Sequence, residues 1–329
     1  MRAGPLVVVG ASSGGIDAMQ TIGEALPADF PAPICVVIHM AANSPNALPA
    51  ILAHRSALPV ESASDGMRLE PGHIYVAQPD RHLVVEPGVL RTPQGPRENL
   101  TRPAVDPLFR SAAQTYGPAT IGVLLTGNLD DGTAGLWAVK RLGGTAIVQD
   151  PTDAPFPGMP ASALRHVDVD YSVPLVEIAP LLMELTGMPA QPAAQGMDAG
   201  IDIEVNVARS QNALDAGLER IAEPSLLSCP ECHGVLMRMR EAPPLRFRCH
   251  TGHAYSSRSL LAALGDHIEH TIWNAVRALE EETLLLQRLA QAPDATGEEI
   301  DRAREARQQS EALRQFVLSR ESESLPVTE

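Results

Sequence analysis

The chain has 329 residues, enough for two or three domains, and 44% of them are hydrophobic, as in ordinary globular proteins. Its formal net charge of −15 is the opposite of the basic footprint that a general nucleic-acid binder carries. No apolar run approaches the roughly 18 residues of a membrane span, and Val7–Val9 leads into a glycine turn instead of a signal peptide. We therefore expect a cytoplasmic protein with no nucleic-acid partner and no membrane insertion.

Residues 6–186 alternate between short apolar runs and amphipathic stretches. The runs are nearly continuous in Val, Ile and Leu, as strands buried on both faces are, and they cover Leu6–Val9, Ile34–Ile38, Ile74–Ala77, Ile121–Leu125 and Thr145–Val148. Helical candidates lie between them at Ile16–Leu26, Pro107–Tyr116 and Gly132–Leu142. This alternation predicts an α/β fold with a doubly wound, mostly parallel sheet between two helical layers, a Rossmann-like arrangement.

The first predicted strand leads into a glycine-rich turn, Gly10-Ala11-Ser12-Ser13-Gly14-Gly15, ahead of a helix. A nucleophilic serine on such a turn needs small neighbours, and the helix N-terminus offers N–H groups to an oxyanion. The turn also resembles the cofactor turn of short-chain dehydrogenases, so by itself it supports a hydrolase and a nucleotide-binding protein equally. Those dehydrogenases need a Tyr-x-x-x-Lys pair, and the only lysine, Lys140, has Leu136 four positions before it.

Two further residues favour the hydrolase. His39 ends the predicted strand Ile34–Ile38, and Asp131 follows the predicted strand Ile121–Leu125. The carboxyl ends of parallel strands share one edge of a sheet, where open α/β folds build their sites. Ser12 would attack a carbonyl, His39 would take its proton, and Asp131 would orient the imidazole. For the acidic pair Asp130–Asp131, a helix N-cap or a two-carboxylate metal site is the alternative.

Five ordered motifs carry a resemblance to a known family: Val9–Gly15, Val37–Met40, Pro71–His82, Arg102–Phe109 and Leu125–Gly132. Together they resemble the catalytic domain of the chemotaxis receptor methylesterase (CheB) family. The resemblance implies hydrolysis of glutamate γ-methyl esters on chemoreceptor helices, with release of methanol, deamidation of glutamines as a second activity, and no cofactor for catalysis. By motif position it places the nucleophile at Ser12, the base at His39 and the aspartate at Asp131, not Asp130. It also implies that Ser13 lines the active site and that a backbone N–H near Asn128 serves the oxyanion.

The sequence departs from the family at two places. Members commonly read Thr-Gly-Met-Gly-x-Asp-Gly at the aspartate loop, where this chain has Asn128 and Leu129 in place of the Met-Gly pair. Members also typically carry an N-terminal receiver domain whose phosphorylation gates the site. This sequence begins at its first catalytic strand, so we expect no such control in cis. A separate response regulator or methyltransferase is then an expected partner, beside the methylated receptor helices.

The composition changes after the predicted catalytic domain, residues 1–188. A proline- and alanine-rich stretch predicts a linker over 189–224. A Cys-x2-Cys pair and a Cys-x3-His pair follow, separated by residues 233–248, at Cys229, Cys232, Cys249 and His253. This spacing suits a tetrahedral structural Zn²⁺ in a ribbon-like module over 225–258, whose small core needs the metal to fold. His253 is favoured over His250 as the fourth ligand and His233 is a weaker candidate; a reduced thiol pair beside a chance histidine is the alternative.

Residues 259–329 are predicted to form a helical region with a polar tail. Apolar residues recur at spacings of three and four from Leu261 to Leu279, and Thr296-Gly-Glu-Glu299 fits the capping box of a second helix. A helical hairpin packed on the ribbon is the first expectation, and a dimerising or partner-binding helix is the second.

The whole sequence predicts a serine hydrolase with a Ser12–His39–Asp131 triad and, through the family resemblance, a protein-glutamate methylesterase. Two alternatives come from other classes of protein. One is a catalytically inactive signalling adaptor with the same fold, and the intact triad weighs against it. The other is a nucleotide-binding oxidoreductase, which the missing Tyr-x-x-x-Lys pair disfavours.

Overall fold

A parallel sheet of seven strands forms the centre of the fold. The structure is a computed structural model that describes residues 4–188, 198–209, 212–240, 243–293 and 295–323. The strand order is β3-β4-β2-β1-β7-β8-β9, and every neighbouring pair is parallel. The strands are β1 Leu6–Ala11, β2 Ile34–Ile38, β3 Val60–Ser62, β4 Ile74–Val76, β7 Thr120–Leu124, β8 Thr145–Gln149 and β9 Tyr171–Val173. The predicted doubly wound α/β fold is confirmed, and β3 and β9 are short edge strands that the prediction missed.

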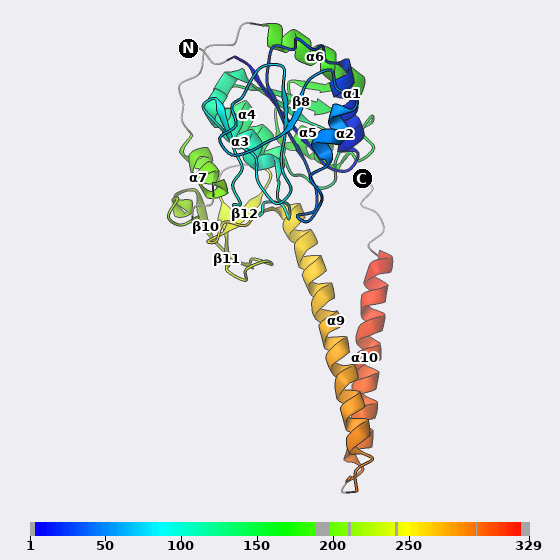
Figure 1. Ribbon diagram of the computed structural model, residues 1–329. Helices are drawn as coiled ribbons and strands as arrows, with labels where there is room; N and C mark the ends of the chain where they lie inside the picture. The colour runs from blue at the N-terminus through cyan, green and yellow to red at the C-terminus, as the bar shows by residue number, and fades with distance from the viewer. Residues whose placement is uncertain (1–3, 189–197, 210–211, 241–242, 294, 324–329) are drawn as a thin grey trace. The chain divides into compact units, whose positions relative to one another are not determined.

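Helices cover both faces of this sheet (Figure 1). Helices α1 Gly15–Ala25, α2 Leu48–Ala53 and α6 Leu175–Gly187 pack in the core that holds Val7 and Val9 of β1. Helices α3 Val105–Tyr116, α4 Thr133–Arg141 and α5 Gly158–His166 pack in the core that holds Leu6 and Val8. Successive strand residues point to opposite faces, so a strand covered on both sides is apolar throughout. A short 3-10 turn, η1 Gly117–Ala119, follows α3, and a separate hairpin pairs β5 Val84–Glu86 with β6 Val89–Arg91.

The segment predicted as a linker, 189–224, contains helices. Residues 189–197 lie outside the described residues, but α7 Ala199–Ala208 and α8 Leu218–Ile221 follow them. Asp198 caps α7 by accepting hydrogen bonds from the N–H groups of Gly200 and Ile201. The apolar side chains of α7 are buried, because the helix packs beside α3 and α4. The segment is therefore not a linker over its whole length.

A second sheet follows α8. Its four antiparallel strands are β10 Ala222–Ser228, β11 Val235–Met239, β12 Arg246–Cys249 and β13 Ala254–Ser256, in that order. We call residues 222–260 the ribbon module. The described residues up to Leu260 form one compact unit, and those from Leu261 onwards form another. The ribbon module thus belongs to the same compact unit as the parallel sheet.

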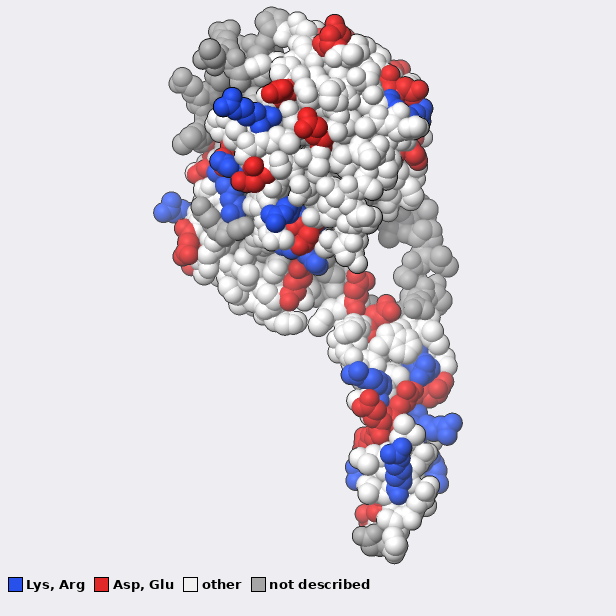
Figure 2. Space-filling model, viewed as in Figure 1, with Lys and Arg blue, Asp and Glu red and all other residues white. Residues whose placement is uncertain are grey.

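Two long helices end the described chain, α9 Ser257–Leu289 and α10 Glu298–Glu323. They run antiparallel, with ion pairs between Glu282 and Arg302 at 3.2 Å and between Glu280 and Arg314. The Thr296 N–H donates to the Glu299 carboxylate at 3.2 Å, as the predicted capping box requires, whereas Thr296 Oγ1 accepts from the Glu298 N–H at 3.4 Å. The predicted helical region is confirmed. Charges of both signs follow one another along these helices (Figure 2). None of the helices in the described part of the chain is both long and apolar enough to cross a membrane.

Candidate active site

Ser12, His39 and Asp131 come together at the carboxyl ends of three adjacent strands. Ser12 follows β1, His39 follows β2, and Asp131 lies in the loop after β7; the strand order places β1 between the other two. The Ser12 N–H donates to the carbonyl of Thr126 at 3.0 Å, and the His39 N–H donates to that of Ala11 at 3.1 Å. Backbone hydrogen bonds therefore fix the start of all three loops relative to one another.

Asp131 is a buried carboxylate held by four hydrogen-bond donors. His39 Nε2 lies 2.7 Å from Oδ2, which also accepts from the Val105 N–H at 2.7 Å. Oδ1 accepts from Asn99 Nδ2 at 2.9 Å and from the Asp106 N–H at 3.3 Å. Burial raises the pKa of Asp131, but the hydrogen bond and charge of His39 and the bonds from Val105 and Asn99 outweigh it, so the pKa falls below its ordinary value. Asp131 is thus an anion at neutral pH.

This arrangement fixes the tautomer of His39. An anionic Asp131 can only accept, so Nε2 carries a proton and Nδ1 is left as the basic nitrogen. The side chain of His39 keeps 14% of its surface exposed, whereas that of Asp131 keeps 3%. Within the described residues the Ser12 hydroxyl makes no hydrogen bond. Nucleophile–base contacts are often longer than a hydrogen bond before substrate binds, so the edge still offers a nucleophile beside an oriented base.

The loop after β7 lies against the Ser12 turn. A Cβ on Gly127 would lie 2.8 Å from Ser12 Cβ, so only glycine allows this close approach. Gly14 has a φ of 76°, the left-handed conformation that glycine adopts without strain, and it caps α1. The Asn128 side chain donates to Ser13 Oγ at 3.2 Å, which places Asn128 and Ser13 side by side near Ser12.

Asp130 has a different partner from its neighbour. Its Oδ1 accepts a hydrogen bond from Ser256 Oγ of β13 at 2.6 Å, and burial raises its pKa. His39 therefore pairs with Asp131 and not with Asp130. The sequence carried no indication that Ser256, more than a hundred residues away, would reach this loop.

Sequence reasoning missed three residues that support Asp131. Asn99 and the Val105 N–H bond it directly, and Asp106 accepts from the Gly135 N–H at 2.6 Å and from Asn99 Nδ2 at 3.1 Å. Burial and the charge of Asp131 raise the pKa of Asp106 to about 8. Val105 and Asp106 lie in the motif Arg102–Phe109, whose pattern gives its members no individual role, and nothing in the sequence marks Asn99.

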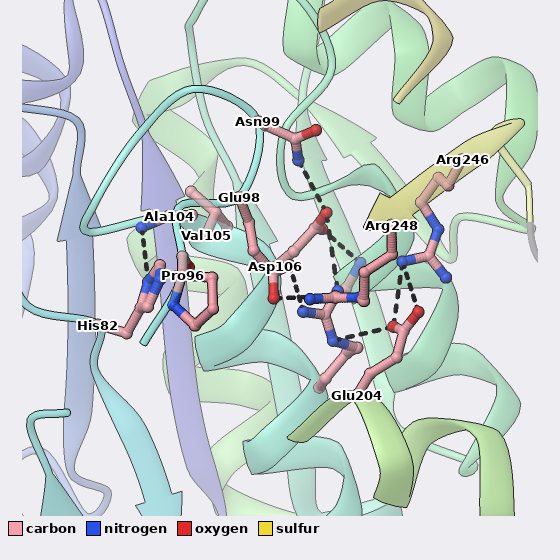
Figure 3. Close-up of polar contacts among 12 residues, drawn as sticks. His82, Pro96, Glu98, Asn99, Ala104, Val105, Asp106, Glu204, Arg246 and Arg248 are labelled. Carbon is pink, nitrogen blue, oxygen red and sulfur yellow. Dashed lines mark hydrogen bonds and ion pairs between the residues drawn. The ribbon is translucent and has the colours of Figure 1, made fainter. Parts of the chain in front are cut away.

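His82, from the motif Pro71–His82, is buried and holds the segment that leads to α3 (Figure 3). Its Nδ1 accepts from the Ala104 N–H at 3.3 Å, and its Nε2 donates to the carbonyl of Pro96 at 2.8 Å. Burial lowers the pKa of His82. A neutral imidazole in one tautomer satisfies both bonds, so His82 supports the loop without taking part in proton transfer.

The four predicted metal ligands lie in two turns of the ribbon module. Their ligand atoms all lie within 4.8 Å of one another. The Sγ atoms of Cys232 and Cys249 are 3.6 Å apart, and His253 Nδ1 is 3.6 Å from Cys249 Sγ and 3.8 Å from Cys229 Sγ. Tetrahedral Zn²⁺ with bonds of about 2.0–2.3 Å spaces its ligand atoms roughly 3.3–3.8 Å apart, so the cluster fits such an ion. His253 belongs to the cluster, and His250 and His233 do not.

Comparisons with known proteins cover the first part of the chain. A profile of the family described as CheB methylesterase matches residues 7–182. A curated relative from Leptospira interrogans is 39% identical over 180 residues, 54% of this chain and 93% of the relative. Protein-glutamate methylesterase/protein-glutamine glutaminase 2 of Anaeromyxobacter dehalogenans is 42% identical over 181 residues, 55% of this chain but only 53% of that relative. The crystal structure of the Thermotoga maritima CheB methylesterase catalytic domain matches with a TM-score of 0.54 and 38% identity, covering 56% of this chain and 99% of that one.

Proposed function

The chain belongs to the CheB methylesterase family, and from that premise we propose that it hydrolyses methyl esters of glutamate side chains on chemoreceptor helices. The observation that carries the proposal is the hydrogen bond of 2.7 Å between His39 Nε2 and Asp131 Oδ2, formed on strands that flank the one bearing Ser12. A buried anion, an imidazole in a fixed tautomer and a serine on a glycine turn are the parts that acyl transfer requires.

The geometry suits a two-step mechanism. Ser12 Oγ attacks the ester carbonyl carbon while its proton passes to His39 Nδ1. The bond from that carbon to the methoxy oxygen then breaks, His39 returns the proton to this oxygen, and methanol leaves a glutamyl ester on Ser12. Water, deprotonated by His39, attacks that ester and regenerates the Ser12 hydroxyl, releasing a glutamate carboxylic acid that ionises. Asp131 stays anionic throughout and stabilises the imidazolium.

Asn128 and Ser13 are the proposed lining of the oxyanion site. Their mutual hydrogen bond holds the loop after β7 beside the nucleophile, and within the described residues the Ser13 and Asn128 N–H groups donate to no backbone carbonyl. Donors aimed at the developing oxyanion contribute on the order of 10²–10³ in rate each. The same site would deamidate a glutamine side chain, with ammonia leaving in place of methanol.

Release of methanol from a methylated receptor fragment tests the activity. We expect the wild type to release methanol and Ser12→Ala to release none, because the attacking oxygen is gone. Ser56→Ala is the matched control, since this serine hydroxyl bonds the Leu58 backbone ahead of β3 and leaves the site intact. Equal inactivity of wild type and Ser12→Ala would favour the signalling adaptor, and binding of NAD(P) with a Kd on the order of 1 μM would favour the oxidoreductase.

We further propose that Cys229, Cys232, Cys249 and His253 hold a structural Zn²⁺. Four protein ligands leave no open position for substrate, and His253 Nε2 lies 3.5 Å from a Glu231 carboxylate oxygen, the kind of partner that orients a ligating histidine. Elemental analysis of purified protein should find about one zinc ion per chain, and less than a tenth of that in Cys229→Ser. Cys35→Ser is the matched control, because Cys35 is buried in the parallel sheet away from the cluster. Equal zinc content in the two variants would refute the assignment.

A further inference from the structure

Asn99 lies between the candidate triad and the ribbon module. Its side-chain nitrogen donates to Asp131 Oδ1 at 2.9 Å and to Asp106 Oδ2 at 3.1 Å. Its side-chain oxygen accepts from the Ser256 N–H at 2.9 Å and from Ser259 Oγ at 3.0 Å. A carboxamide has two N–H donors and two lone pairs, and all four are used here. Flipping the amide would place its oxygen against the Asp131 carboxylate and its NH2 group against the Ser256 N–H, so the orientation is fixed from both sides.

The backbone around Asn99 is also bound to the ribbon module. The Asn99 N–H donates to the carbonyl of Ala254 at 2.8 Å, and the Ala254 N–H donates to that of Arg97 at 3.1 Å. These bonds add the segment 97–99 to the edge of β13 as a short parallel bridge. Ser256 also donates from Oγ to Asp130, and the same Oγ accepts from the Ser259 N–H at 3.0 Å. One end of the ribbon module thus bonds Asp130 directly and reaches Asp131 through Asn99.

A buried ionic network anchors the segment beside Asn99 (Figure 3). Glu98 is bound by Arg110 of α3 at 2.5 Å and by Arg248 of β12 at 3.0 Å. Glu204 of α7 is bound by Arg110 at 3.2 Å and by Arg246 of β12 at 3.0 Å. Every member keeps at most 8% of its side chain exposed. Such charges remain in place only while all their partners are present, so β12 cannot move away without leaving buried charges unpaired.

We propose that Asn99 is a positioning residue for the hydrolysis, and that Ser256 and Ser259 of the ribbon module hold its carboxamide in the orientation that donates to Asp131. The proposal rests on the proposed function. It makes the triad depend on a part of the chain beyond residue 182, where the match to the methylesterase family ends. Asn99 acts on His39 through Asp131: it fixes the carboxylate plane and so keeps Oδ2 directed at His39.

Two substitutions test this dependence in the full-length protein. Asn99→Ala removes both donors, and Ser259→Ala removes one of the two donors to Asn99 Oδ1 while leaving Asn99 itself in place. We expect kcat to fall about tenfold or more with KM nearly unchanged, because a misaligned base slows the chemical step and not binding. Ser225→Ala is the matched control, since this β10 serine makes its hydrogen bond to the carbonyl of Leu236 within the module. Its kcat should match the wild type.

The pH profile separates positioning from a merely structural role. Among the described residues, the titratable groups that interact electrostatically with Asp131 include His39, Asp106, Asp130 and His82. Losing the Asn99 donors makes the His39–Asp131 pair bind its shared proton more tightly, so the acid limb of kcat/KM should move up by roughly one pH unit. A role in folding alone would lower the amount of active enzyme and leave the limb in place.

An NMR titration of the His39 ring keeps the test independent of turnover. It is run in the Ser12→Ala background, with His39→Gln to assign the resonance. A higher titration midpoint in Asn99→Ala and in Ser259→Ala than in Ser225→Ala supports the proposal, even if no methyl ester proves to be a substrate. Unchanged midpoints together with unchanged kcat in both variants would overturn it. If Asn99→Ala does not fold, Ser259→Ala decides the question by the same two measurements.

Discussion

Replacing Asp131 by asparagine tests the triad where the structure constrains it most. The four groups around the carboxylate are all donors: His39 Nε2 and the Val105 N–H on Oδ2, and Asn99 Nδ2 and the Asp106 N–H on Oδ1. An asparagine has one oxygen and one NH2 group. In either orientation its NH2 group therefore faces two groups that also need an acceptor.

Both orientations carry a cost that can be estimated. With NH2 at the Oδ2 position, His39 must accept through Nε2 and protonate Nδ1, which removes the base and lowers kcat on the order of 10⁴-fold. With NH2 at the Oδ1 position, Asn99 and the Asp106 N–H lose their acceptor in a buried site. An unsatisfied buried donor costs about 1–3 kcal/mol, so the two together would lower the free energy of unfolding by about 2–6 kcal/mol.

Methanol release and urea unfolding measure the two costs in the same protein. Asp130→Asn is the matched control, because Asp130 is an adjacent buried carboxylate that bonds Ser256 and not His39. We expect this control to retain kcat within about tenfold of the wild type, since it leaves the triad intact. If Asp131→Asn kept a tenth or more of wild-type kcat, or if the control lost as much as Asp131→Asn, the assignment of Asp131 to the triad would be refuted.

Three further substitutions or conditions have defined outcomes. Arg248→Met removes one of the two arginine partners of the buried Glu98. The charges of Arg110 and Arg248 hold the pKa of Glu98 at about 2 against the effect of burial, so the variant leaves this carboxylate under-compensated. Its free energy of unfolding should fall by about 3–5 kcal/mol in urea titrations, and a loss below about 1 kcal/mol would contradict a buried ionic network. Burial lowers the pKa of His82, so as the pH falls the unfolded chain binds a proton at this residue before the folded protein does. Below about pH 6.5 the free energy of unfolding should therefore fall by up to about 1.4 kcal/mol per pH unit until the folded protein also protonates. Urea titrations between about pH 7.5 and 5.5 measure this pH dependence, and the part due to His82 should be absent in His82→Gln. Leu129 has a φ of 59°, in the left-handed region that favours glycine. Leu129→Gly relieves about 1–2 kcal/mol of backbone strain and costs about 0.5–1 kcal/mol of chain entropy, so thermal unfolding should show equal or higher stability; a clear loss would mean that the Leu129 side chain contributes packing.

The catalytic edge of the sheet was predictable because its causes are local. Continuous apolar runs mark strands covered on both faces, and the five predicted strands all occur in the parallel sheet. The carboxyl ends of such strands lie together, so Ser12, His39 and Asp131 could be assigned to one edge from their positions after β1, β2 and β7. The Cys-x2-Cys and Cys-x3-His spacings likewise reflect two tight turns, and the structure brings those four ligand atoms within 4.8 Å.

The supports of the site were not predictable, because their causes are not local. Asn99 receives its partners from β13 and α9, at sequence separations of 157 and 160 residues, and no spacing rule relates positions so far apart. Five charged residues look like surface charges in the sequence, and only the packing of α3, α7 and β12 against one another buries and pairs them. They are Glu98, Arg110, Glu204, Arg246 and Arg248. For the same reason the sequence predicts a linker where α7 lies: the apolar residues of this helix find their partners on α3 and α4, not within the helix. The sequence alone determined which residues can do the chemistry, through strand pattern and turn composition; the tertiary structure decided what holds them, because a hydrogen bond to a buried carboxylate depends on distance in space and not on distance along the chain.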